Sequence, residues 1–258
     1  MEKQLTIVIP VFNKWRYTAS CLASVFHSTI NKDAYEVLVV DNSSTDMTQP
    51  LLSHLQKEGF PVTIIKNETN LDYLLAANQG WKEVRTAFCL HLNNDVIVKP
   101  NTIELMLKPF QADSRIGIMG GIQISGRTPH YYHTYFYRGN DVNKDSIVYV
   151  EPLTETEKEQ EYIEVESTGF GCAIVKREVW EKVGFFDEQF TPCMSEQEDY
   201  MLRVKEAGFK VCISPKAFYT HEVGVTTADN QSYYNYIVNR NRQLFKNKWG
   251  EKLRRNEI

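Results

Sequence analysis

Long apolar runs and paired cysteines are both absent from this 258-residue sequence. Polar or charged residues interrupt every hydrophobic stretch before the roughly 20 residues that a membrane-spanning helix needs. The first five residues also lack the apolar segment of a signal peptide. We therefore expect a soluble, cytoplasmic domain. The cysteines fit that expectation, because they are dispersed without a C-x-x-C pair, as reduced thiols are: Cys21, Cys89, Cys172, Cys193 and Cys212.

Glycine-rich phosphate loops are missing as well. The first apolar segment, residues 4–11, runs into Phe12, Asn13 and Lys14, with neither G-x-G-x-x-G nor a Walker lysine loop. This absence counts against a dinucleotide-dependent dehydrogenase, a P-loop enzyme and a sugar-phosphate nucleotidyltransferase. The formal net charge of -4 gives no reason to expect nucleic-acid binding.

Apolar strands alternate with helical patterns in the first part of the chain. Helical periodicity marks residues 17–26 and 74–84, and Asn13 is placed to cap the first helix. Alternation of strands with helices predicts βαβ units. We therefore expect an α/β fold whose central sheet is mostly parallel, doubly wound and flanked by helices. The strand-like runs are residues 4–11, 35–40, 62–66 and 88–92.

Polar side chains follow two of these strands, at the edge where open α/β sheets bind ligands. Asp41 follows the second strand, and Asn93 and Asp95 follow the fourth. A carboxylate at Asp41 could accept the ring N–H of uracil or thymine. Asn93 and Asp95 could hold a hard cation together with ribose hydroxyls. Each has a structural alternative, because Asp and Asn also form and cap turns.

Five segments, in order, resemble the successive signatures of family 2 glycosyltransferases, with rhamnosyltransferase-like members among the similar sequences. The similarity runs from residue 4 to residue 225 and implies the GT-A fold, an inverting mechanism, a nucleotide-sugar donor and a divalent metal. The segments are residues 7–13 (IVIPVFN), 39–46 (VVDNSSTD), 92–96 (LNNDV), 169–177 (GFGCAIVKR) with 183–188 (VGFFDE), and 198–208.

The resemblance also implies roles for individual residues. Asp95 would bind the metal, Mn²⁺ or Mg²⁺, together with His221, because relatives commonly place a histidine after the Glu-Asp helix; imidazole favours manganese. Asp199 matches the general base that takes the proton of the acceptor hydroxyl. The UDP- or dTDP-linked donor would contact Pro10, Val11, Phe12, Asn13, Asp41, Asn70, Asn78, Asn93, Asn94, Gly169 and Gly171.

Some positions depart from the family pattern. Asn93 stands where relatives often carry Asp, and a neutral amide attracts a cation less strongly. Asp72 and Ala77 stand where relatives usually have Gly and Arg. The missing arginine removes a contact to the diphosphate, which Lys14 or the metal would have to replace.

Several residues of the second half have structural alternatives. Gly169 and Gly171 could let the backbone approach a sugar, or could form a tight bend. Ser195 and Glu198 fit a capping box, and Asp199 could be a charge at a helix start.

Acceptor contacts are expected from two places. Tyr135 and Tyr137, in the aromatic stretch 129–137, could stack on a sugar or pack in a β-hairpin, and Glu198 is a further candidate. Residues 233–249 predict an amphipathic helix. The basic residues after it could contact an anionic membrane or a lipid-linked acceptor, although a solvated helix is the plainer alternative: Lys252, Arg254 and Arg255.

We therefore expect one GT-A domain over residues 1–258, with a nucleotide-sugar-binding half (1–96), an acceptor and catalytic half (97–225) and a C-terminal helix with a basic tail (226–258). It would transfer a sugar to a hydroxyl of a glycan, a lipid-linked sugar or a protein. Its location would be cytoplasmic, with peripheral contact to the inner face of a membrane. The alternatives are a catalytically degenerate nucleotide-sugar-binding scaffold and, more remotely, a nucleotidyltransferase.

Overall fold

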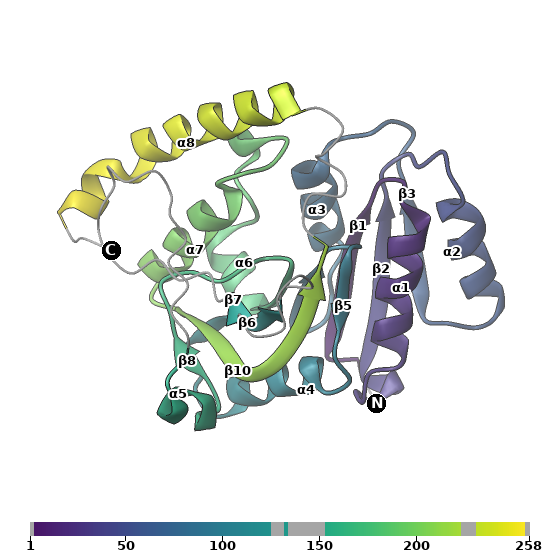
Figure 1. The fold of residues 1–258 in the computed structure, drawn as a ribbon, viewed down its shortest axis with the longest axis horizontal. Coiled ribbons are helices and arrows are strands. Elements are labelled where there is room, and N and C mark those ends of the chain that lie inside the picture. The colour runs from purple at the N-terminus through teal and green to yellow at the C-terminus, as the bar shows by residue number, and fades with distance from the viewer. Residues whose placement is uncertain (1–2, 125–131, 134–152, 223–230, 256–258) are drawn as a thin grey trace.

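The computed structural model describes residues 3–124, 132–133, 153–222 and 231–255. Within these ranges the strands form one ten-stranded sheet of order β3-β2-β1-β4-β9-β6-β10-β5, with β7 beside β6 and β8 beside β10 (Figure 1). The strands are β1 Leu5–Val11, β2 Tyr35–Asp41, β3 Val62–Lys66, β4 Phe88–Leu92, β5 Val96–Val98, β6 Ile116–Ile124, β7 Tyr132–His133, β8 Ile163–Glu164, β9 Cys172–Lys176 and β10 Lys210–His221. The α-helices are α1 Trp15–Phe26, α2 Thr48–Lys57, α3 Tyr73–Lys82, α4 Thr102–Leu107, α5 Glu155–Glu159, α6 Arg177–Val183, α7 Glu196–Glu206 and α8 Gln231–Arg254, and short 3-10 turns are η1 Lys32–Ala34, η2 Lys108–Gln111 and η3 Glu188–Phe190.

The first half of the sheet is parallel, as the sequence predicts. Strands β3, β2, β1 and β4 pair side by side in one direction, and every residue of β1 is buried. β-branched residues suit this position because both faces of the strand are covered. Val11, Asp41 and Leu92 end three of these strands, so the polar residues that follow share one edge of the sheet.

Beyond β4 the sheet is mixed rather than mostly parallel. Strand β9 runs antiparallel between β4 and β6, and β10 pairs parallel with β6. The short β5 is antiparallel to β10 and places Val96 opposite His221. This pairing brings His221, at the end of β10, beside the Asn-Asn-Asp segment that follows β4.

Helices cover both faces of the sheet. Buried residues of α1, α2 and α4 belong to one apolar cluster with Ile7, Ile9, Val37 and Val39. Buried residues of α3, α6 and α7 belong to a second cluster with Val8 on the other face. The alternation of neighbouring β1 residues between the two clusters follows from the two-residue period of a strand. The α/β class expected from the sequence is confirmed.

Helix α8 is not a solvated tail. It runs across the top of the molecule in Figure 1, over the segment that leads into α7. Asn241 and Trp249 are buried, and Lys248 and Lys252 pair with Asp187 and Glu206. These basic side chains therefore have partners within the chain. Among the residues that the structure describes, no helix has the length and apolarity to cross a membrane.

Two predicted helix caps are wrong. Lys14, in a left-handed conformation with φ of 60°, precedes α1, whose first N–H, of Trp15, donates to Asp46 Oδ2 at 3.0 Å. Asn13 instead accepts from the backbone N–H of Thr45 at 2.8 Å. Ser195 also has a positive φ of 68°, and its side chain makes no capping hydrogen bond to α7.

Candidate functional site

Asp95 and His221 meet at the edge of the sheet. Asp95 Oδ1 lies 3.0 Å from His221 Nε2, and each side chain is 13% exposed. The backbone supports the contact, because Glu222 N–H donates to the carbonyl of Asp95 at 3.1 Å. The structure thus brings together the two residues to which the family resemblance gives the metal, although they are 126 positions apart in the sequence.

The Asp95–His221 pair has the donor atoms of a divalent metal site. Carboxylate oxygen and imidazole nitrogen together suit Mn²⁺. Across the described ranges, no group of three or more His, Cys, Asp or Glu side chains could hold a metal ion.

Gly171 gives the histidine its space. A Cβ at this position would lie 3.0 Å from both Cε1 and Nδ1 of His221. The carbonyl of Gly171 also accepts the N–H of Asn93 at 2.9 Å. The close approach that the structure shows is to the imidazole ring, and a contact of Gly171 with a sugar stays a prediction. Whether Gly169, at the other end of the same bend, contacts a donor stays a prediction.

Asp41 has one carboxylate oxygen in use and one that is not. Oδ1 accepts from the N–H of Ser44 at 2.9 Å, while Oδ2 is buried without a hydrogen-bond partner. A buried oxygen in that condition is costly unless something donates to it. Both alternatives from the sequence therefore apply to the same side chain: Oδ1 caps the turn, and Oδ2 is available to an N–H donor of a ligand.

Asn70 helps to build the loop after β3. Its Oδ1 accepts from the side chain of Asn42 at 2.7 Å and from the N–H of Asp72 at 2.9 Å. Asn42 Oδ1 in turn accepts from Asn67 and from the N–H of Leu71, each at 3.0 Å. These bonds connect the loop to the end of β2, beside Asp41.

Two other asparagines predicted to contact the donor have partners within the protein. Asn78 exchanges two hydrogen bonds with the backbone of Phe186, 2.9 Å as donor and 3.0 Å as acceptor. Asn94 donates to Thr18 Oγ1 at 3.1 Å. The buried Asn78 therefore ties α3 to the segment before η3, and we do not retain it as a donor contact. Pro10 and Val11, at the end of β1, are buried, while Phe12 and Asn13, which follow the strand, are partly exposed.

Asn93 is the end of a chain of polar side chains. Its Oδ1 accepts from the hydroxyl of Tyr73 at 3.0 Å, and that hydroxyl also lies 2.7 Å from Nε2 of His91. Trp81 Nε1 donates to Nδ1 of His91 at 3.1 Å. The sequence gives no signal for Tyr73 or His91, because their contact depends on how helix α3 packs on the face of the sheet that contains β4.

Asp199 is in the wrong environment for a general base. It is 0% exposed, and Arg203 Nε donates to its Oδ2 at 2.9 Å. Its Oδ1 receives Trp249 Nε1 at 2.8 Å and Lys248 Nζ at 2.6 Å. A carboxylate enclosed in this way offers an acceptor hydroxyl no accessible oxygen, so the geometry argues against Asp199 as the base. The side chain instead joins α7 to α8.

Glu196, at the first position of α7, has the properties that Asp199 lacks. It is 6% exposed, and its Oε2 has no hydrogen-bond partner. Burial, with repulsion from Glu198, raises the pKa of Glu196 to about 8. The same carboxylate raises the pKa of Tyr73, after burial and ahead of Asp95, so Tyr73 lies near both carboxylates. Glu196 is therefore the functional candidate that the sequence interpretation missed, two residues before Glu198.

The remaining candidates lie around this centre or outside the described residues. Gln197 accepts from the N–H of Phe170 at 3.2 Å and so attaches the start of α7 to the Gly-Phe-Gly bend. Glu198 is partly buried beside Glu196, and its role at an acceptor stays a prediction. Tyr135 and Tyr137 fall outside the described residues.

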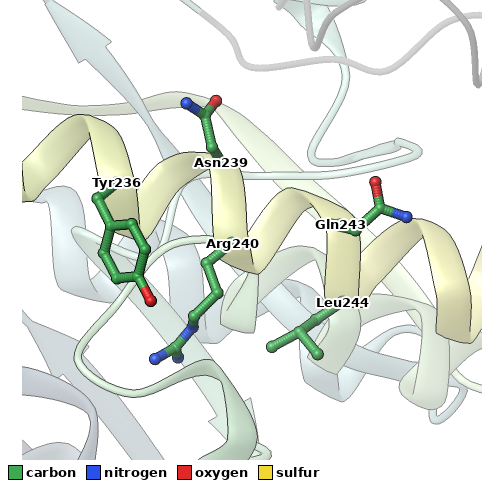
Figure 2. Close-up of a pocket in the computed structure, with 5 residues that line it drawn as sticks. All are labelled: Tyr236, Asn239, Arg240, Gln243 and Leu244. Carbon is green, nitrogen blue, oxygen red and sulfur yellow. The ribbon is translucent and has the colours of Figure 1, made fainter.

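A separate hollow lies on α8. Figure 2 shows its lining, which contains no carboxylate or imidazole and therefore does not resemble the metal site. The residues are Tyr236, Asn239, Arg240, Gln243 and Leu244. Arg240 is turned back to the protein, where its guanidinium donates to the carbonyls of Gln189 and Thr191.

Comparison with known sequences identifies the family of this chain. Residues 6–184 match the model of the family described as glycosyl transferase family 2. A dolichyl N-acetyl-alpha-D-glucosaminyl phosphate 3-beta-D-2,3-diacetamido-2,3-dideoxy-beta-D-glucuronosyltransferase of Methanococcus voltae is 28% identical over 123 residues, which cover 46% of this chain and 38% of that protein. The chain thus spans well under half the length of this curated relative.

Solved structures share the fold. GalNAc-T7, crystallised with UDP, GalNAc and Mn²⁺, superimposes with a TM-score of 0.71 at 16% identity, covering 91% of this chain and 47% of that one. Staphylococcus aureus TarS 1–349 in complex with UDP-GlcNAc gives a TM-score of 0.64 at 15% identity, covering 92% and 66%. At these identities the likeness shows the GT-A fold alone.

Proposed function

This chain belongs to glycosyl transferase family 2, and on that premise we propose that it transfers a sugar from a UDP- or dTDP-activated donor to a hydroxyl, with inversion and metal assistance. The acceptor would be a glycan, a lipid-linked sugar or a protein. The observation that carries the proposal is the contact between Asp95 and His221, in a chain whose strand β2 ends in Asp41 at the same edge of the sheet as β4.

The donor would lie along the carboxyl edge of β1, β2 and β4. The partnerless Oδ2 of Asp41 accepts the ring N–H of uracil or thymine. Asp95 and His221 would hold the metal, which would supply positive charge to offset the negative charge of the leaving group. This role matters in a chain that has Ala77 where relatives usually carry a diphosphate-binding arginine.

Glu196 would act as the general base. An inverting transfer is a single displacement, so one carboxylate must take the acceptor proton while the hydroxyl oxygen attacks the anomeric carbon. A carboxylate whose pKa is about 8 holds that proton more strongly than an exposed one. The partnerless Oε2 of Glu196 supports this assignment over the enclosed Asp199.

The first test is calorimetric titration of the protein with UDP, dTDP and GDP, each with and without Mn²⁺. We expect manganese-dependent binding that prefers the two pyrimidine nucleotides. Asp95→Ala should weaken it by about tenfold or more, because one ligand of the metal is lost. Asp33→Ala, a change of the same kind at the η1 turn far from this edge, is the matched control.

Absence of nucleotide binding with every metal would overturn the donor site. Binding without any turnover of UDP- or dTDP-sugars would instead favour the alternative, a degenerate nucleotide-sugar-binding scaffold, which Asn93 and Ala77 motivate. The cytoplasmic location and contact with a membrane surface remain part of the proposal, to be tested by fractionation of cells that produce the chain.

A further inference from the structure

We propose that Tyr73, held by His91 and Trp81, is a positioning residue that fixes the amide of Asn93 with its NH2 group toward His221. Asn93 then acts as a hydrogen-bond donor to an oxygen of the nucleotide-sugar and not as a metal ligand. The inference rests on the proposed function for its ligand, but its structural part concerns the protein alone.

The direction of the hydrogen bonds follows from donor chemistry. Trp81 can only donate through its indole N–H, so Nδ1 of His91, 3.1 Å away, must be the acceptor. His91 is 0% exposed, and burial lowers its pKa to about 4, so the ring is neutral at ordinary pH. A neutral imidazole whose Nδ1 accepts carries its proton on Nε2. That proton points to the hydroxyl of Tyr73, 2.7 Å away.

The hydroxyl of Tyr73 must therefore donate elsewhere. Its second neighbour is the side chain of Asn93 at 3.0 Å, and only the carbonyl oxygen of that amide can accept. With the amide rotated by half a turn, two donors would face the hydroxyl oxygen and the hydroxyl proton would have no acceptor. Leaving such a buried group unpaired is unfavourable, so one orientation is selected.

The selected orientation decides what Asn93 offers to a ligand. Its Nδ2 lies 3.5 Å from His221 Nε2, a longer contact than the 3.0 Å between that nitrogen and Asp95. The amide N–H groups therefore lie beside the predicted metal ligands, where they cannot coordinate a cation. They can donate hydrogen bonds to an oxygen of a ribose or a diphosphate. In relatives with Asp at this position the same place is taken by an acceptor, so the neutral amide changes the kind of contact and not merely its strength.

Aromatic side chains pack around the residues that make these hydrogen bonds and restrict their motion. Trp81 and His91 pack edge to face at 5.8 Å between ring centroids, and Phe186 and Phe170 lie against them. Tyr73 itself packs edge to face on His91 at 5.9 Å. Side chains enclosed in this way lose little further freedom when a ligand binds.

Two NMR measurements test the structural part without any nucleotide. Long-range nitrogen–proton correlation should show His91 as the Nε2–H tautomer. Nuclear Overhauser contacts should connect the Asn93 NH2 protons with the ring of His221, and Tyr73→Phe should weaken those contacts. An Nδ1–H tautomer, or a charged His91, would overturn the inference, and so would an Asn93 amide that keeps its contacts in Tyr73→Phe.

A double-mutant cycle tests the consequence for the ligand. Tyr73→Phe removes only the hydroxyl and should weaken UDP binding in Mn²⁺ by about five- to tenfold. In an Asn93→Asp background the same change should cost clearly less, because the two oxygens of a carboxylate are equivalent and need no orientation. Equal losses in the two backgrounds would reject the orienting role. Tyr162→Phe is the matched control, since its hydroxyl donates to Asp113 at the opposite end of β10.

Failure of this inference and failure of the proposed function give different results. If no nucleotide binds to the unmodified protein, the proposed function fails, while the tautomer of His91 and the orientation of Asn93 still decide the structural part. If nucleotide binds but the cycle is additive, the donor site stands and the orienting role fails.

Discussion

Three carboxylates lie within four residues at the start of α7, and burial gives them different chemistry. Asp199 is enclosed by Arg203, Lys248 and Trp249, whereas Glu196 has an oxygen without a hydrogen-bond partner. A buried charge with several partners stabilises a structure only as long as all partners are present. A buried acid without them keeps its proton until the pH is high.

Replacement of Glu196 should remove the base. In the wild type, kcat/KM should rise with pH and level off above about pH 8, because only the ionised carboxylate takes the acceptor proton. Glu196→Gln should lower kcat by about 100-fold or more at all pH values and abolish this rise. Pre-steady-state rates from about pH 6 to about pH 9, with bound nucleotide measured alongside, provide the readout.

Asp199→Asn is the contrasting variant. It should lower the free energy of unfolding by about 3 kcal/mol, since Arg203 and Lys248 lose their buried partner, and yet retain the pH-dependent rise. The opposite pattern, with the rise lost in Asp199→Asn and kept in Glu196→Gln, would restore Asp199 as the base. The raised pKa of Glu196 has its own cost: unfolding releases this proton, so stability falls as pH increases from 4.5 to about 8.

The sequence shows that these carboxylates lie at the start of a helix, but it could not show which of them is enclosed by partners and which could act as a base. The spacing of Asp199 and Arg203, four residues apart in a helix, does indicate an ion pair. The other partners, Lys248 and Trp249, come from α8 about fifty residues later, and no local pattern predicts that contact. The contact between Asp95 and His221 was predictable because the resemblance supplied both residues as candidate metal ligands. The contact of Tyr73 with Asn93 was not, since it depends on how α3 packs against β4.

Among the elements, α8 does most to shape the segment before Glu196. Asn241 is 0% exposed, and its Nδ2 lies 2.6 Å from the carbonyls of Phe190 and Cys193 and 3.1 Å from that of Met194. Arg240 contacts the carbonyl of Thr191, next to the cis Thr191–Pro192 peptide. One face of the helix therefore holds a non-helical loop by its backbone, in a region where Met194 and Ser195 have positive φ.

Asn241→Ala should loosen that loop. We expect unfolding free energy to fall by about 2 kcal/mol, because three carbonyls, that of the buried Phe190 among them, lose their donor. Turnover should decrease more than nucleotide affinity, since the loop leads to Glu196 and not to Asp41. Urea unfolding and calorimetry measure the two effects. Asn239→Ala, at an exposed position of the same helix, should change neither, and an equal loss in both variants would refute the anchoring role.

The elements themselves were largely predictable, and their pairing only in part. Parallel strands separated by helices leave a strong pattern, so β1, β2, β3 and β4 and the helices α1 and α3 lie where the sequence indicates, whereas α2 was not predicted. Strand β9 is an apolar run like the others, and its antiparallel insertion between β4 and β6 leaves no mark in composition. The α8 helix was expected, but an amphipathic pattern does not say which surface the apolar face covers.

At the scale of the whole molecule, the two expected halves share one sheet. Strand β4, from the first half, pairs with β9 from the second, and β5 pairs with β10. The candidate site takes Asp41, Asn93 and Asp95 from one half and Glu196 and His221 from the other. A division at residue 96 would therefore cut both the sheet and the site.

The molecule should consequently unfold as one unit. Native-state hydrogen exchange is the measurement: the amides of Val8 in β1 and Met119 in β6, both fully buried, should open with the same free energy and the same dependence on urea. Coupling is expected because β4 and β9 connect β1 to β6 in a continuous hydrogen-bonded sheet. Distinct opening energies, different by more than about 1 kcal/mol, would show that the halves are separate folding units.

The contact between α7 and α8 also sets an order in time. During synthesis Asp199 leaves the ribosome 50 residues before Trp249, the indole that hydrogen-bonds to it. Until then its charge lacks two of its three partners, and the loop before Glu196 lacks Asn241. A chain interrupted before α8 therefore carries the edge of the sheet with Asp41 but lacks the contacts that hold the segment before Glu196. If Glu196 is the base as proposed, translation would delay catalysis until α8 has been made.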